Sequence, residues 1–138
     1  MGEIDFNAAM DRVMVADPRY RREAYEFVRE GLDFTQKIVV QSANGSRRHV
    51  RGQELVAGLR DYALAQYGPM ALTVLDEWGI RRCEDFGEIV FNLIDAGIFS
   101  KTADDSRDDF KDGYDFIKAL KEPFLPKAKI TTPSKGKE

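Results

Sequence analysis

The sequence is poor in the residues that most often carry out chemistry in proteins. Its 138 residues include one cysteine, Cys83, and one histidine, His49. A single cysteine excludes an intramolecular disulfide, and no local signature links the two residues as a nucleophile and its base. The sequence therefore predicts no catalytic residue and favours a non-enzymatic protein.

Long hydrophobic segments are also missing. No apolar run approaches the ~20 residues that a helix needs to span a bilayer. The N-terminus lacks the basic segment and apolar run of a standard secretory signal. We therefore expect a soluble cytoplasmic protein with no membrane partner.

Cofactor and metal motifs are incomplete. Gly52 and Gly58 lack the lysine and the spacing of a phosphate-binding loop. The acidic stretch 104–113 resembles a calcium loop, but a loop starting at Asp108 places Ala119 where a bidentate glutamate is required. We therefore predict neither a cofactor nor a metal site.

Charge is distributed unevenly along the chain. Residues 61–121 hold 7 Lys and Arg against 13 Asp and Glu, whereas residues 1–60 hold 10 against 9. Because binding to nucleic acid draws mainly on Lys and Arg that face phosphates, the acidic second half is unsuited to duplex DNA.

The second half has the pattern of a winged helix. Apolar residues at helical spacing predict an amphipathic helix over 84–97, preceded by a helix over 69–78 with Pro69 at its first position. The link 79–83 is short enough for a helix-turn-helix pair. Ile98-Phe99 and the segment 114–116 are candidate strands of a wing, with Asp112-Gly113 as a turn signal.

Helical spacing also recurs in the first half. It predicts helices over 4–16, 20–37 and 53–67. Between the last two, Ile38–Val40 and Arg47–Val50 flank Asn44-Gly45, a strong hairpin signal, although a polar loop is the alternative. The predicted fold class is therefore mostly helical α+β, with a winged-helix-like second half preceded by helices and a possible short hairpin.

The chain has the length of one domain by the rough prior of ~150 residues each. We expect a single globular domain over 1–125. Residues 126–138 are rich in Lys, Ser, Thr and Pro, which predicts a disordered basic tail.

Two groups of residues are candidate sites. The predicted helix-turn-helix corner and the acidic helix after it form a candidate interaction surface of Trp78, Arg81, Arg82, Asp85 and Glu88. The alternatives are that Trp78 is a core residue and that Arg81 and Arg82 pair with nearby carboxylates. The candidate anion site is Arg47, Arg48, His49 and Arg51 before a helix N-terminus; the alternative is a charged, protected hairpin edge.

The stretch from Arg48 to Phe116 resembles the Minf family of uncharacterised bacterial proteins. The segments HVRGQEL, YGPMA, VLDEWGIRR, DFGEIVFNLI and DSRDDF carry the resemblance, which extends over about Pro18 to Leu125. It implies a single-domain bacterial protein and transfers no activity, substrate or site residue.

The leading functional hypothesis is a non-enzymatic protein-interaction or regulatory module that binds another protein or a second copy of itself. It rests on a helix-turn-helix pattern whose second helix has the wrong charge for DNA. The alternative is binding of RNA or DNA through the first half and the basic tail, with Arg19, Arg21, Arg22, Arg47, Arg48 and Arg51 as the contacts.

Overall fold

The computed structural model describes residues 6–42, 50–99, 107–111 and 113–125, and these residues are mostly helical. The α-helices are α1 (Phe6–Ala16), α2 (Arg22–Ser42), α3 (Gly52–Tyr67), α4 (Ala71–Glu77) and α5 (Cys83–Asp95). Short helical turns are η1 (Gly68–Met70), η2 (Arg107–Phe110), η3 (Ile117–Lys121) and η4 (Glu122–Phe124). The five predicted helices are therefore confirmed over the described part of the chain.

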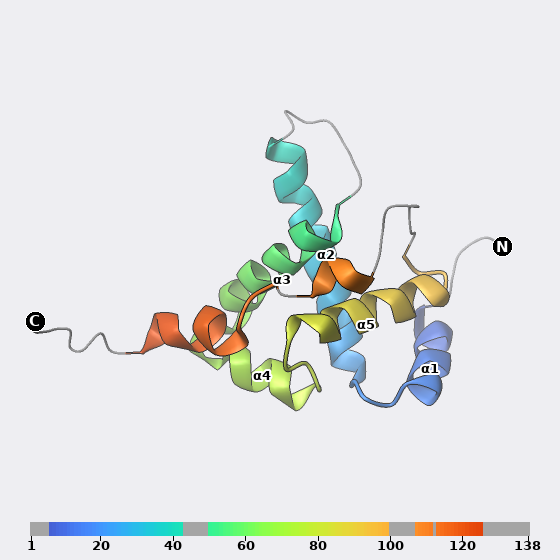
Figure 1. The fold of residues 1–138 in the computed structure, drawn as a ribbon. Coiled ribbons are helices and arrows are strands. Elements are labelled where there is room, and N and C mark those ends of the chain that lie inside the picture. The colour runs from blue at the N-terminus through green and yellow to red at the C-terminus, as the bar shows by residue number, and fades with distance from the viewer. Residues whose placement is uncertain (1–5, 43–49, 100–106, 112, 126–138) are drawn as a thin grey trace, which may run out of the picture.

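Helix α2 is the central element (Figure 1). It packs against α3 on one side and α5 on another, and the fully buried Tyr25, Phe27 and Val28 come from it. Phe86, Ile89 and Leu93 of α5 are also completely buried, as are Leu59 of α3 and Leu75 of α4. The apolar stripes seen in the sequence thus meet in one hydrophobic core.

The chain turns after α4 and after α5 in the same way. Gly79 and Gly97 both have positive φ, 94° and 81°, which a residue without a Cβ adopts without strain. Ile80 N donates to Leu75 O at 2.9 Å, and Ile98 N donates to Leu93 O at 2.9 Å. These are the bonds of the Schellman motif, so the predicted ends of both helices are confirmed.

The predicted hairpin is wrong in its first strand. Ile38–Val40 belong to α2, which continues to Ser42. Val39 is buried four residues after the buried Thr35, so packing on the helical stripe outweighs the strand preference of β-branched residues. The turn Asn44-Gly45 and residues 47–49 lie outside the described residues.

The predicted wing is not confirmed. Ile98 and Phe99 lie in a bend after α5, and Phe116 opens a helical turn. Phe116 is buried and its ring lies 5.6 Å from that of Phe86, so the aromatic residues of this segment anchor it to α5. The tail 126–138 lies outside the described residues, so the domain boundary stays a prediction.

Candidate functional site

Two segments far apart in sequence meet beside α4 and α5. They are the α1–α2 loop (residues 17–21) and the α4–α5 link (residues 78–82). The Arg21 N–H donates to the Trp78 carbonyl at 3.2 Å. We call this meeting point the α4–α5 corner and define it by the exposed or half-buried side chains of Arg21, Trp78, Arg81 and Arg82.

The approach of these segments depends on Gly79. A Cβ atom at Gly79 would lie 2.4 Å from the carbonyl oxygen of Arg19. That distance is far shorter than any real Cβ contact, and the neighbour is backbone that cannot swing away. The glycine is therefore needed both for its positive φ and for the close contact with the α1–α2 loop.

The Asp85 carboxylate holds the two segments of the corner together through hydrogen bonds. One carboxylate oxygen accepts a 2.6 Å hydrogen bond from the Tyr20 hydroxyl, and the other accepts from the backbone N–H groups of Arg81 (2.9 Å) and Arg82 (3.2 Å). It therefore caps α5 and holds the α1–α2 loop. Burial, with the bond to Asp85, raises the pKa of Tyr20 well above its ordinary value.

Asp17 provides a second set of hydrogen bonds, which joins the α1–α2 loop to α5. Its carboxylate accepts from the Arg19 guanidinium, with Nε at 2.8 Å and an η nitrogen at 2.7 Å, and from Asn92 Nδ2 at 2.9 Å. The hydrogen bonds from Arg19 hold the pKa of Asp17 far below its usual range. Arg19 also reaches Glu88 of α5 at 3.4 Å.

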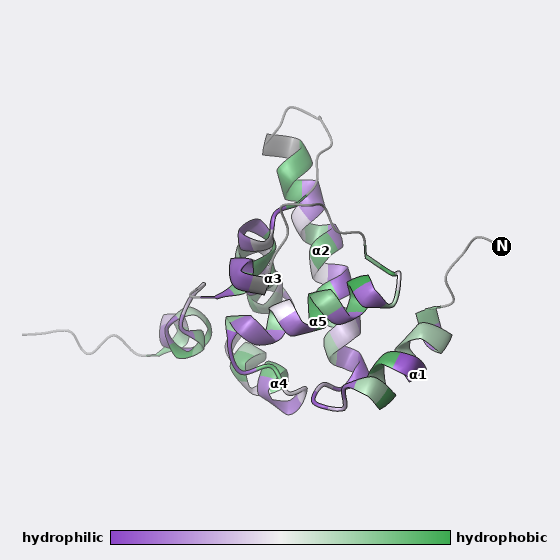
Figure 2. Ribbon diagram, turned by 45° about the vertical axis from the view of Figure 1, so that its right-hand side comes forward, coloured by the Kyte–Doolittle hydropathy of each residue, from purple (hydrophilic) through white to green (hydrophobic). Residues whose placement is uncertain are grey.

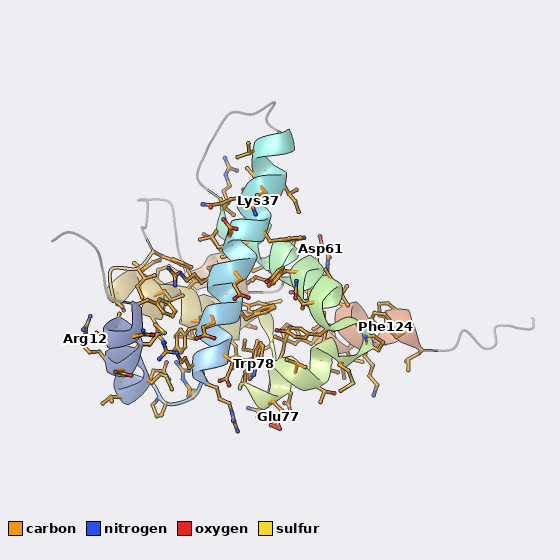
Figure 3. The ribbon with its side chains drawn as sticks, turned by 180° about the vertical axis from the view of Figure 1, so that it is seen from behind. Arg12, Lys37, Asp61, Glu77, Trp78 and Phe124 are labelled. Carbon is orange, nitrogen blue, oxygen red and sulfur yellow. The ribbon has the colours of Figure 1, made fainter. Side chains whose placement is uncertain are left out.

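The predicted interaction residues therefore divide into two kinds. Asp85 and Glu88 face contacts inside the molecule. Trp78 is half-buried, and its ring lies 5.8 Å from those of Phe27 and Tyr67 (Figure 3). Part of its side chain therefore belongs to the core, as the alternative interpretation predicted, and part is exposed. Arg81 pairs with Asp76 at 2.7 Å but leaves 67% of its side chain exposed.

Two arginines of the corner carry free guanidinium groups. Arg21 and Arg82 are exposed and form no ion pair with any residue that the structure describes. The sequence analysis placed Arg82 in the interaction surface but assigned Arg21 only to the alternative nucleic-acid contacts. Only tertiary structure brings Arg21 beside Trp78, since 57 positions separate them in the chain.

The predicted anion site is mostly outside the described residues, because it includes Arg47, Arg48 and His49. Arg51 is exposed immediately before α3, and its N–H donates to Glu54 at 3.0 Å. Glu54 thus occupies part of the helix N-terminus that an anion would use.

The arginines of the alternative nucleic-acid hypothesis lie at several places. Arg21 belongs to the α4–α5 corner, and Arg19 lies in the same α1–α2 loop and pairs with Asp17. Arg22 lies over the ring of Phe6 and pairs with Glu26 at 3.0 Å. The hypothesis stays a prediction, since Arg47 and Arg48 are not described.

Cys83 is enclosed by the fold. It is 2% exposed, and its Sγ lies 3.5 Å from the Tyr114 carbonyl oxygen. Burial raises the pKa of its thiol, so the reactive thiolate is disfavoured. Among the described residues, no group of three His, Cys, Asp or Glu is placed to hold a metal ion.

A groove of about 970 Å³ lies along α2, from Arg22 to Lys37. On one side Phe34 and Glu30 lie against Tyr62 of α3, and on the other Val90 and Ile94 of α5 line it. The C-terminal end of α2 extends beyond the neighbouring helices (Figure 1). The polar lining of the groove includes Arg22, Glu26 and Arg29 of α2, of which Arg22 and Glu26 pair with each other.

The comparisons with known proteins give no relative: no family model, no curated protein and no solved structure matches this chain. The resemblance to the Minf family thus stays a prediction. Within the ranges described above, none of the helices has the length and hydropathy to cross a membrane.

Proposed function

We propose that this protein is a non-enzymatic interaction module that binds an acidic surface of another protein through the α4–α5 corner. The observation that carries the proposal is the 3.2 Å bond from Arg21 N to Trp78 O, which brings the loop with the exposed Arg21 against the link that holds Trp78 and the exposed Arg82. Tryptophan and arginine are the residues most enriched at the energetic centres of protein interfaces.

The rigidity of the corner supports the proposal. The bonds of Asp85 and Asp17 fix both segments before any partner arrives. Binding to a surface that is already ordered costs less conformational entropy than binding to a flexible loop. Each exposed arginine then presents a planar fork of donors that matches a carboxylate.

The winged-helix-like prediction belongs with this proposal. In a helix-turn-helix protein that binds DNA, the second helix lies in the major groove. The exposed or half-buried charges of α5 are Glu84, Asp85, Glu88 and Asp95, which would face phosphates with the wrong sign. The acidic α5 therefore supports a protein partner in preference to duplex DNA.

The test uses the full chain, tagged, for affinity purification from its source cells with and without nuclease, followed by binding of the purified partner. The double variant Arg21→Glu/Arg82→Glu is compared with Arg12→Glu, an exposed arginine on α1 at a distance from Trp78 (Figure 3). We expect a nuclease-resistant partner whose affinity falls at least about tenfold, or 1.4 kcal/mol, in the double variant only.

Two results would contradict the proposal. One is loss of the captured material on nuclease treatment, which would favour nucleic-acid binding. The other is a partner whose affinity is the same for the double variant and for Arg12→Glu.

A further inference from the structure

Helix α1 covers the core from the edge of the molecule. It lies beside α5 and the start of α2 and away from α3, as Figure 1 and Figure 2 show. Its inward face is apolar: Ala9 and Met10 are completely buried, and Val13 is 8% exposed. Asp11 and Val15 on the opposite face are exposed. One face of α1 therefore holds it to the rest of the fold.

The start of α1 lies against α2. Two guanidinium groups lie over the ring of Phe6, with Arg29 Cζ 4.2 Å and Arg22 Cζ 5.8 Å from the ring centroid. Arg22 also donates a hydrogen bond to the side-chain oxygen of Asn7. Phe6 and Asn7 line the groove along α2 together with Ile94 of α5. Both α2 and α5 therefore contribute to the surface on which α1 lies.

The loop that follows α1 is fixed by bonds outside α1. Asp17 accepts a hydrogen bond from Asn92 of α5, and Arg21 N donates to Trp78 O. Neither bond involves a residue of α1, which ends at Ala16. Displacement of α1 therefore leaves these bonds intact and needs a change of backbone angles only at the junction between α1 and the loop.

The stability of α1 depends on the surface that it covers. An isolated helix of 11 residues is marginal in water. Within the described residues, α1 has no extended backbone approach to another element, whereas α2 approaches both α3 and α5 closely. Side-chain packing on one face is therefore its main attachment. We expect α1 to open locally before α2 and α5 do.

The contacts of α1 define the kind of helix that fits this surface. They require an aromatic residue followed by small or aliphatic residues three, four and seven positions later, as at Phe6, Ala9, Met10 and Val13. The surface thus selects a helix by the spacing of its apolar side chains, and α1 is the helix that the structure shows in place.

We propose that α1 is an exchangeable arm, and that the surface it leaves on α2 and α5 binds α1 of a second copy of this chain. A second copy carries the same residues at the same spacing. Two copies that exchange α1 reciprocally bury Met10 and Val13 again in both and form a symmetric dimer. The proposal does not depend on the function of the α4–α5 corner, although such a dimer carries two corners.

The probe is a fluorescently labelled synthetic peptide of residues 6–16, whose binding to the full chain is measured by anisotropy. In the chain, Met10→Ser/Val13→Ser weakens the attachment of its own α1. We expect this variant to bind the peptide at least about tenfold more tightly than wild type, because the tethered α1 of wild type competes. A peptide with the same two serines does not bind. The chain variant Asp11→Ser/Val15→Ser, altered on the exposed face, behaves like wild type.

Two measurements on the wild-type chain test the proposal even if the double variant fails to fold. In hydrogen exchange followed by mass spectrometry, we expect the amides of α1 to exchange at least about tenfold faster than those of α2 and α5. In native mass spectrometry of unlabelled and isotope-labelled chains mixed at high concentration, we expect mixed dimers that excess peptide suppresses.

Any of four results overturns the proposal. They are exchange of the α1 amides no faster than that of α2, a folded double variant that does not bind the peptide, equal binding of the serine peptide, and mixed dimers that excess peptide leaves unchanged. Peptide binding by a chain that stays monomeric at every concentration also overturns it, and assigns the surface to a helix of another protein.

Discussion

Gly58 of α3 lies directly against Thr35 of α2. A Cβ atom at Gly58 would stand 1.9 Å from the Thr35 Oγ1 and 2.8 Å from its Cβ. The Thr35 hydroxyl itself donates to the Gly31 carbonyl at 2.7 Å, so it is held in place inside the interface. The two helices can therefore approach this closely only because position 58 has no side chain.

The first prediction follows from that contact. Gly58→Ala destabilises the protein by about 1–3 kcal/mol, although alanine is the better helix former, because overpacking forces α2 and α3 apart. Urea unfolding monitored by circular dichroism measures the change. The double variant Gly58→Ala/Thr35→Ala loses less stability than the sum of the single variants, and strict additivity would show that the two residues are not in contact.

The second prediction concerns Gly79. Gly79→Ala destabilises the protein by more than Gly68→Ala, because both glycines have positive φ but only Gly79 has backbone, the Arg19 carbonyl, in the path of a Cβ atom. At Gly68 such a Cβ atom would meet open space. We expect a difference of at least about 1 kcal/mol in the free energy of unfolding. Equal losses of stability in the two variants would show that the Arg19 carbonyl does not restrict a side chain at position 79.

The third prediction is an acid dependence of stability. The folded-state pKa of Asp17 lies below its unfolded value, so its contribution is present above pH ~4 and is lost as the pH falls below it. Asp17→Asn is therefore destabilised by about 1–3 kcal/mol at neutral pH, with a smaller difference from wild type near pH 3. Unfolding of both proteins at the two pH values measures this. Asp11→Asn, at an exposed position on α1, is the control and follows wild type at both.

The fourth prediction concerns alkaline pH. The pKa of Tyr20 is raised in the folded state, so its stabilising contribution is complete below pH ~10 and is lost as the pH rises above it. Tyr20→Phe keeps the ring but loses the bond to Asp85, and is destabilised by about 1.5–3 kcal/mol at neutral pH. Its stability then falls less than that of wild type between pH 9 and about pH 11. If the stabilities of both proteins fell equally with pH, a group other than Tyr20 would be responsible for the alkaline loss.

The helices were predictable because the cause of each is local. Apolar spacing such as Phe86, Ile89, Val90 and Leu93 is visible in a short window, and Gly79 and Gly97 mark the helix ends. The strand predicted at Ile38–Val40 was wrong because its helical state depends on tertiary packing. A run of β-branched residues predicts a strand unless the burial of Val39 in the core is known.

The candidate site was only partly predictable. Trp78, Arg81 and Arg82 stood out as unusual side chains in a short link. The roles of Asp17, Tyr20 and Asp85 depend on contacts across some 65 to 75 positions, and no periodicity reports such contacts. The exposure of Phe124 and Ile117 was equally hidden, because an apolar residue in a sequence reads the same whether it is covered or not.

The shortness of α4 makes this helix dependent on the contacts around it. A helix of seven residues does not persist alone in water, so α4 exists only while its capping bonds and the contact of Trp78 with Phe27 hold it. Release of the α1–α2 loop removes the Tyr20 bond to Asp85 and the Arg21 bond to Trp78 together. We therefore expect the backbone amides of this region to exchange with solvent as one cooperative unit, and the partner proposed for the α4–α5 corner to slow the exchange of the whole unit at once.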